Sequence, residues 1–181
     1  MMAVWAIRLA VMTVTLTLAA AAGATTEPSC TDEGFGWSQT DPPLNLRHVL
    51  CGEIKKNGDV VGMHSRTLID TAPIKEMQPQ PTQPNGLYSA RVIFENGRSK
   101  NSTFYPDNCS VAQVTRSILY AVNNSHGPGK PWGKLGCSAP ATPDSSYCTG
   151  PGGERFVIRF AVFDDGRINT AFPQMGESCP Q

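Results

Sequence analysis

The sequence has no excess of charge of either sign, since its 181 residues include 15 Lys and Arg against 15 Asp and Glu. This balance excludes a disordered charged tail, a histone-like basic protein and an acidic solvating segment. It also argues against a domain that holds nucleic acid by a broad positive field, because such domains usually have a pI above about 9. A nucleic-acid role would therefore require a local site.

Several familiar catalytic motifs are also missing. The chain has no G-x-S-x-G elbow, P-loop, H-E-x-x-H or G-x-G-x-x-G pattern, so the hydrolases, metalloproteases, NTPases and dinucleotide enzymes that carry them are not indicated. No C-x-x-C pair is present, which argues against a thioredoxin-like redox site and a zinc ribbon.

Long apolar runs are absent except near the N-terminus. There, one charge at Arg8 precedes an apolar stretch of about 14 residues and small residues that end in Ala22-Gly23-Ala24. The stretch is shorter than the roughly 20 residues that span a bilayer. We predict a signal peptide over residues 1–24, with a retained anchor as the alternative. The expected location is extracellular or periplasmic, with no membrane association after cleavage.

The cysteine count agrees with export. All six cysteines follow the predicted signal peptide, and an even number in a secreted chain predicts three disulfides. Cys137 and Cys148 flank a loop rich in Pro and Ser, which suggests that they form a local pair.

The rest of the chain divides into a loop-rich lead-in over residues 25–46 and a domain over residues 47–181. We expect strands over residues 59–64, 87–94, 102–105, 155–163 and 168–172, and a helix over residues 110–124 with a capping box of Ser110 and Gln113. Asn96-Gly97 and Asp165-Gly166 predict hairpin turns. Residues 72–84 and 127–153 are expected to be irregular. The pattern indicates an α+β fold with an antiparallel sheet and a packed helix.

Only three histidines are present, and two of them suggest chemistry. His48 and His64 lie on segments flanked by glycines and could meet across a cleft. A pair of imidazoles suits RNA cleavage, one as base on the ribose 2′-hydroxyl and the other as acid on the leaving oxygen. The alternatives are ordinary loop histidines, or a zinc site of His48, Cys51 and His64. His126, in a Gly- and Pro-rich loop, is expected to be solvated.

Five short blocks resemble the bacterial EndoU nuclease domain in the same order. They read LRHVLCGEI, VVGMHSR, NGLYSARVIF, KNSTFYPDNCSVAQV and GRINTAFP, and the resemblance runs from about residue 47 to residue 173. The resemblance implies a fold similar to the barnase and RelE-like ribonucleases. It also implies an endoribonuclease that cleaves single-stranded RNA, often at uridines, and leaves a 2′,3′-cyclic phosphate.

The resemblance also implies roles for individual residues. His48 and His64 correspond to the family's acid/base pair, and its catalytic lysine best matches Lys100, with Lys75 and Arg91 as other candidates. Thr170 matches a late threonine that helps to hold the phosphate or base. Phe172 stands where an aromatic residue, often tyrosine, stacks on uracil. No metal site is expected and no cofactor is required, although Mn²⁺ dependence is an open alternative.

Many bacterial members of this family are toxins at the end of large delivery proteins, whereas this chain carries its own predicted signal peptide and six cysteines. We therefore expect a free-standing secreted endoribonuclease with RNA as its partner. One alternative is a non-catalytic binding module on the same fold. The other is a toxin nuclease with an immunity or inhibitor protein as a further partner.

Overall fold

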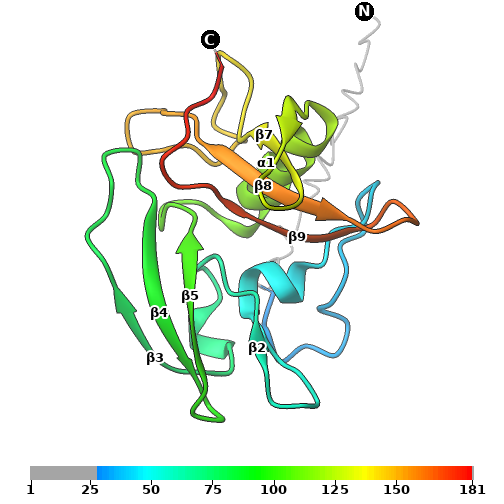
Figure 1. Ribbon diagram of the computed structural model, residues 1–181, viewed down its shortest axis with the longest axis vertical. Coiled ribbons are helices and arrows are strands. Elements are labelled where there is room, and N and C mark those ends of the chain that lie inside the picture. Colours follow the sequence, from blue (N-terminus) through cyan, green and yellow to red (C-terminus); the bar gives the residue numbers. More distant parts are fainter. Residues whose placement is uncertain (1–27, 181) are drawn as a thin grey trace, which may run out of the picture.

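The computed structural model describes residues 28–180, so the predicted signal peptide over residues 1–24 lies outside the described residues. The fold is α+β, as expected, with antiparallel sheets and one main helix, α1 (Val111–Asn123) (Figure 1). The strands are β1 (Glu53–Ile54), β2 (Val60–Val61), β3 (Ile74–Pro79), β4 (Tyr88–Phe94), β5 (Ser99–Phe104), β6 (Gly127–Pro128), β7 (Lys134–Cys137), β8 (Val157–Val162) and β9 (Ile168–Pro173). Between residues 28 and 180, no helix is both long and apolar enough to span a membrane.

The first sheet has the order β3-β4-β5. Alternate residues of β4 are buried, as the sequence pattern predicts for a half-buried strand. Asn96-Gly97 forms the expected turn into β5, with Gly97 at a φ of 80°. The irregular connection predicted over residues 72–84 is wrong in its first half, because β3 pairs there with β4. As an edge strand, β3 tolerates Pro79, which has no N–H to offer a neighbour.

The second sheet has the order β6-β7-β8-β9. The long loop predicted over residues 127–153 is wrong where β6 and β7 form. Gly136 interrupts the run of strand-forming residues in β7, and it has a packing role. A Cβ atom on Gly136 would lie only 2.1 Å from the carbonyl oxygen of Ala121, so α1 packs directly on the backbone of β7 (Figure 1).

The helix α1 begins as the sequence predicts. The Ser110 side chain accepts a hydrogen bond from the Gln113 N–H, and the Gln113 side chain accepts one from the Ser110 N–H. The buried face of α1 includes Val114, Ile118 and Ala121, which belong to the main core. Because Ile158, Phe160 and Ala171 join the same core, this cluster occupies one face of the second sheet and leaves the other for different contacts.

Three disulfides are present, as predicted, but the suggested Cys137–Cys148 pair is wrong. The bridges are Cys30–Cys51, Cys109–Cys148 and Cys137–Cys179. Cys148 is directed toward α1 instead, where its N–H donates to the Ser117 hydroxyl at 2.8 Å. The Cys30–Cys51 bridge joins the lead-in to the short helical turn η1 (Arg47–Cys51).

The lead-in also contributes to the core. Leu44 is fully buried and forms a β-bridge with Ile168 at the start of β9. The segment that follows it, η1, lies beside β9 and near the second short helical turn η2 (Ile69–Thr71). In Figure 1, η1 (cyan) is seen between the two main sheets, below β9. Segments from both halves of the chain therefore meet at this point.

Candidate active site

His48 lies on η1, a five-residue π-helical turn. Its N–H donates to the Asn45 side chain at 3.1 Å, and its carbonyl accepts from the Met63 N–H at 2.9 Å. That second contact brings in the segment after β2, where Gly62 has a φ of 71°. A Cβ atom at Gly62 would lie 2.0 Å from the His48 carbonyl oxygen, so only glycine permits this approach.

His64 is fixed by backbone bonds on both sides. Its N–H donates to the Val49 carbonyl in η1 at 2.7 Å, and its carbonyl accepts from the Tyr105 N–H just after β5 at 2.9 Å. These bonds place the two predicted histidines together, with ring centroids 6.5 Å apart. The structure thus joins residues that are 16 positions apart in the sequence.

The His64 ring is buried and has one defined hydrogen bond. Its Nδ1 lies 2.9 Å from the carbonyl oxygen of Thr103. A carbonyl oxygen can only accept, so Nδ1 carries the hydrogen and the neutral ring has its lone pair on Nε2. Burial, followed by the nearby charge of Lys100, holds the pKa of His64 well below its usual value. The ring is therefore neutral at neutral pH.

His48 has a different partner. Its Nδ1 lies 3.0 Å from Oε1 of Glu53, which follows η1 on β1. The hydrogen bond from His48 lowers the pKa of Glu53 despite the opposing effect of burial, so the side chain is a carboxylate at neutral pH. A carboxylate at this position can stabilise positive charge on the His48 ring. The two imidazoles therefore differ in the chemistry around them.

Lys100 projects toward the same place from β5. Its Nζ donates to the Gly62 carbonyl at 2.7 Å and to the Ser102 hydroxyl at 2.8 Å. Burial lowers the pKa of Lys100 to about 8. The other candidates for the lysine role lie elsewhere. Arg91 is exposed on the opposite face of the sheet, next to Ser99, and Lys75 is exposed on β3.

Thr170 and Phe172 approach from β9. Both flank Ala171, which points into the main core, so their side chains lie on the other face of the second sheet. The Phe172 ring stacks on His64 with 5.1 Å between centroids and 23° between planes. Thr170 is largely buried on the same face, opposite Ala161 of β8.

Two further side chains next to Phe172 were not predicted. Trp132, in the loop between β6 and β7, has its ring 5.7 Å from that of Phe172 in an edge-on arrangement. Arg159 pairs with Phe172 across β8 and β9, and its guanidinium lies 5.8 Å from the Trp132 ring centre. Glu53 was also missed, because a spacing of five residues from His48 matches no side-chain contact of a regular helix. Nothing local in the sequence marks Arg159.

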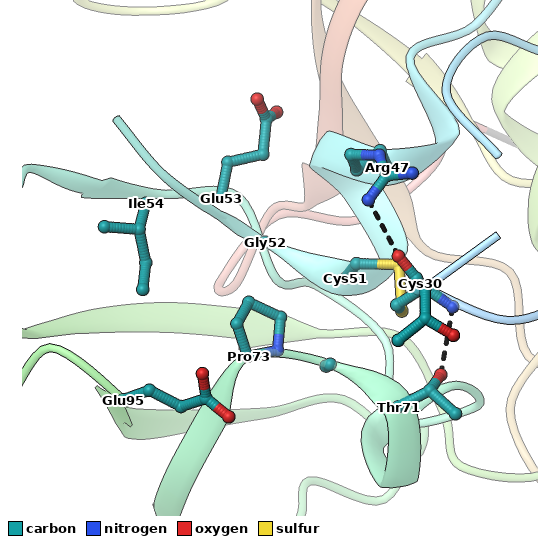
Figure 2. A pocket seen from close by; sticks show the side chains of 11 residues that line it. Cys30, Arg47, Cys51, Gly52, Glu53, Ile54, Thr71, Pro73 and Glu95 are labelled. Atoms are coloured by element: carbon teal, nitrogen blue, oxygen red, sulfur yellow. Dashed lines mark hydrogen bonds between the residues drawn. A yellow bond between two sulfur atoms is a disulfide. The ribbon is translucent and has the colours of Figure 1, made fainter. Parts of the chain in front are cut away.

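A pocket of about 420 Å³ adjoins this cluster at Glu53, which is one of its lining residues. Its lining includes Arg47 and the Cys30–Cys51 bridge, and Arg47 donates to the Cys30 carbonyl at 2.7 Å (Figure 2). The Glu53 side chain, drawn in Figure 2, points away from the Cys30–Cys51 bridge. The lining includes neither His48 nor His64.

The remaining candidates do not join the cluster. Over residues 28–180, no group of three or more His, Cys, Asp or Glu side chains is placed to hold a metal ion. The zinc set of His48, Cys51 and His64 is not available, because the Cys51 sulfur is bonded to Cys30. His126 is exposed, as expected.

The cluster can therefore supply acid–base chemistry at an anionic centre. The cluster contains a neutral imidazole with a free Nε2, from His64, and a second imidazole beside a carboxylate, from His48. The half-buried ammonium group of Lys100 and the aromatic ring of Phe172 lie next to them. Such a set suits transfer of a phosphoryl group, since one ring can accept a proton, the other can donate one, and the ammonium can balance negative charge.

Comparison with known proteins gives two matches. The family model described as bacterial EndoU nuclease matches residues 44–175. A Bacillus cereus protein named Toxin is 30% identical over 137 residues, which cover 72% of this chain and 22% of that protein. The chain thus spans about a fifth of the length of this curated relative. No solved structure matches the chain.

Proposed function

The chain belongs to the bacterial EndoU nuclease family, and on this basis we propose that it is an endoribonuclease acting on single-stranded RNA. In the proposed reaction, the ribose 2′-oxygen attacks the adjacent phosphorus, the bond from phosphorus to the 5′-oxygen breaks, and a 2′,3′-cyclic phosphate forms. The observation that carries this proposal is the pair of imidazoles with opposite partners, 6.5 Å apart. The preference for uridine is inferred from the family resemblance.

In this mechanism His64 is the general base. Its Nδ1–H is held by the Thr103 carbonyl, which leaves the Nε2 lone pair to accept the proton of the 2′-hydroxyl. The lowered pKa keeps the ring in the unprotonated form that a base requires. Stacking on Phe172 fixes the plane of the ring.

His48 is then the general acid. Glu53 accepts from its Nδ1–H and stabilises the charged imidazolium, whose Nε2–H can protonate the leaving 5′-oxygen. After the reaction the proton from the 2′-hydroxyl rests on His64 and His48 has lost one, so solvent must exchange protons with both rings before the next turnover. The base and acid assignments follow from the hydrogen bonds of the two Nδ1 atoms.

Three further residues would act on the substrate. The ammonium group of Lys100 would balance the charge that builds on the phosphoryl oxygens. Thr170 would contact the phosphate or the base, and Phe172 would stack on the base. A phenylalanine at this position lacks the hydroxyl of the tyrosine that is common in the family, so only the stacking contact is proposed.

We propose that the reaction needs no metal ion. The substrate supplies the nucleophile, and residues of this chain supply the acid, the base and the positive charge. Addition of EDTA should leave the cleavage rate unchanged. If EDTA abolished cleavage and Mn²⁺ restored it, this part of the mechanism would be wrong.

Export is part of the proposed function. The three disulfides of the described chain fit an oxidising compartment, in agreement with the signal peptide that the sequence predicts. A second candidate function is a secreted nuclease toxin with an immunity protein, and the Bacillus cereus relative named Toxin favours it. An inhibitor encoded beside the gene, which blocks cleavage in a mixing experiment, would support this second candidate.

The test of the main proposal uses an RNA strand with a single uridine. The wild-type protein should cleave it and leave a cyclic phosphate end, detected by mass spectrometry. His48→Ala and His64→Ala should each lose at least about 100-fold in rate, whereas His126→Ala, at an exposed position, should match the wild type. Binding without cleavage would instead identify a non-catalytic binding module, and full activity of either active-site variant would refute the assigned chemistry.

A further inference from the structure

Trp132 and Arg159 form a second cluster beside Phe172 that the proposed chemistry does not use. Trp132 is 45% exposed, in a loop that the bond from the Gly129 N–H to the Gly133 carbonyl closes at 2.9 Å. It is a large aromatic ring in solvent at the edge of the candidate active site. Single-stranded nucleic acids are commonly bound by such rings, since the bases stack on them.

Arg159 lies beneath this loop and lacks an anionic partner. It is only 8% exposed, and its Nε is buried without a hydrogen-bond acceptor. Among residues 28–180, no carboxylate forms an ion pair with it. A buried charge is normally paired, because the loss of its hydration is costly. The guanidinium can therefore bind an anionic group of a ligand, since no carboxylate of the described residues pairs with it.

Two glycines let the loop lie close to β8 beside Arg159. A Cβ atom on Gly129 would lie 2.7 Å from the Trp132 carbonyl oxygen, and one on Gly133 would lie 2.6 Å from the Phe160 carbonyl oxygen. The Arg159 side chain lies next to both positions, 3.3 Å and 3.5 Å from the same Cβ atoms. Phe172, its cross-strand partner on β9, keeps the guanidinium on the face that carries the candidate active site.

We propose that Trp132 and Arg159 form a second nucleotide subsite, which binds the RNA residue next to the one stacked on Phe172. The base would stack on Trp132, and Arg159 would bind the phosphate of that neighbouring nucleotide. The Trp132 and Phe172 rings are neighbours, with 5.7 Å between centroids and 66° between planes, so bases bound by the two rings would belong to adjacent nucleotides. This inference rests on the proposed function, because it assumes that Phe172 receives the base at the cleavage site.

The test measures binding separately from cleavage. The full chain is titrated with a fluorescent strand of five 2′-deoxynucleotides, a single deoxyuridine flanked by deoxyadenosines, which cannot be cleaved because it lacks the 2′-hydroxyl. Trp132→Ala should bind this strand about tenfold more weakly, and Trp132→Phe should keep most of the affinity. The loss should disappear when the adenine on one side of the uridine is replaced by an abasic nucleotide, since that strand has no base to stack on Trp132.

Arg159→Met tests the phosphate contact. It should bind the strand about tenfold more weakly. The slope of log K against log salt should become less negative by about 0.7. Its melting temperature should equal or exceed that of the wild type, because an apolar side chain replaces a buried unpaired charge. Arg155→Met is the matched control. Arg155 precedes the same strand, but its side chain donates to the Pro180 carbonyl away from the cluster, so binding should not change.

The outcomes separate this inference from the proposed reaction. If the wild type cleaves RNA while Trp132→Ala and Arg159→Met bind the strand as tightly as it does, the subsite is wrong and the reaction stands. If no RNA is cleaved but binding depends on both residues, the reaction is wrong and the subsite stands. A lower melting temperature with unchanged binding would show that Arg159 only supports the fold.

Discussion

His48 and His64 carry the same side chain, and their Nδ1 partners make them different. One faces the carboxylate of Glu53 and the other a backbone carbonyl in a buried setting. The first partner is an anion, whereas the second is a neutral acceptor beside a ring whose pKa is lowered by burial. The two rings are therefore not equivalent, and each is suited to a different role in the proposed reaction.

Lys100 should contribute to the alkaline fall of the rate, together with loss of the proton from the general acid. Burial lowers the pKa of Lys100 to about 8, so the ammonium group loses its proton as the pH rises through that value, and kcat/KM should fall there. On the acid side, the rate should fall only well below the usual range of histidine, where His64 becomes protonated. The measurement is the pH profile of kcat/KM. Lys100→Arg should keep a positive charge and remove the part of the alkaline fall that Lys100 causes near pH 8.

A stability measurement on Lys100→Met completes this prediction. The lysine has a pKa of about 8 in the folded protein and 10.5 as a free side chain, so the unfolded chain binds the proton more tightly. Its contribution to stability is therefore fully present above pH 10.5 and is lost as the pH falls to about 8. Lys100→Met should be inactive but more stable at pH 7, by up to about 3 kcal/mol. An inactive and less stable variant would point to a structural role.

The sequence predicted some residues of the site and missed others for a physical reason. His48, His64, Lys100, Thr170 and Phe172 lie in short blocks with a recognisable order, and the structure brings the two histidines together with Lys100 and Phe172. The role of Arg159 depends on its pairing partner across two strands and on the glycines above it. These are tertiary contacts between residues far apart in the sequence, so no local sequence pattern predicts them.

At the level of elements, prediction succeeded where the pattern was local. Alternating burial in β4, the Asn96-Gly97 turn and the Ser110 cap each depend on neighbouring residues. It failed for β3 and β7, where prolines and glycines hide strands that exist because a neighbouring strand pairs with them. The π-helical turn η1 has no sequence signature, since backbone bonds to the His64 segment shape it.

The Cys30–Cys51 bridge is expected to hold η1 and with it His48. Cys51 ends the turn three residues after His48, and the carbonyl of Cys30 accepts from Arg47 at its start. A variant with Cys30→Ala and Cys51→Ala should lose about 3 kcal/mol of stability and also at least tenfold in kcat/KM at a temperature where it is folded. Urea unfolding and steady-state kinetics measure the two effects.

The matched control removes a bridge that lies away from the histidines. A variant with Cys137→Ala and Cys179→Ala should also lose about 3 kcal/mol or slightly more, since its cysteines are further apart in the sequence, by 42 positions against 21. Its kcat/KM should stay within about twofold of the wild type, because Cys137 lies at the end of β7 on another part of the sheet. Equal losses of activity in both variants would contradict a specific link between η1 and its bridge.

At the scale of the whole molecule, the balanced charge should be visible in the salt dependence of binding. The chain has 15 basic and 15 acidic residues, and the proposed phosphate contacts involve two cations, Lys100 and Arg159. Each contact with single-stranded nucleic acid contributes about 0.7 to the slope of log K against log salt, so we expect a slope between about −1 and −2. Titrations from low to moderate salt measure it. A slope steeper than about −4 would indicate a broad positive surface that this composition does not predict.

The order in which the site residues occur along the chain has a consequence for the cell that makes the protein. The histidines come early, whereas β9 begins only at Ile168 and supplies Phe172, which stacks on His64, and Pro173, whose carbonyl accepts from Thr103. A nascent chain that has not yet reached β9 contains both histidines. It lacks the aromatic ring proposed to stack on the nucleobase, and its core is incomplete. We therefore expect the proposed ribonuclease to be inert toward its own messenger RNA until translation has passed β9.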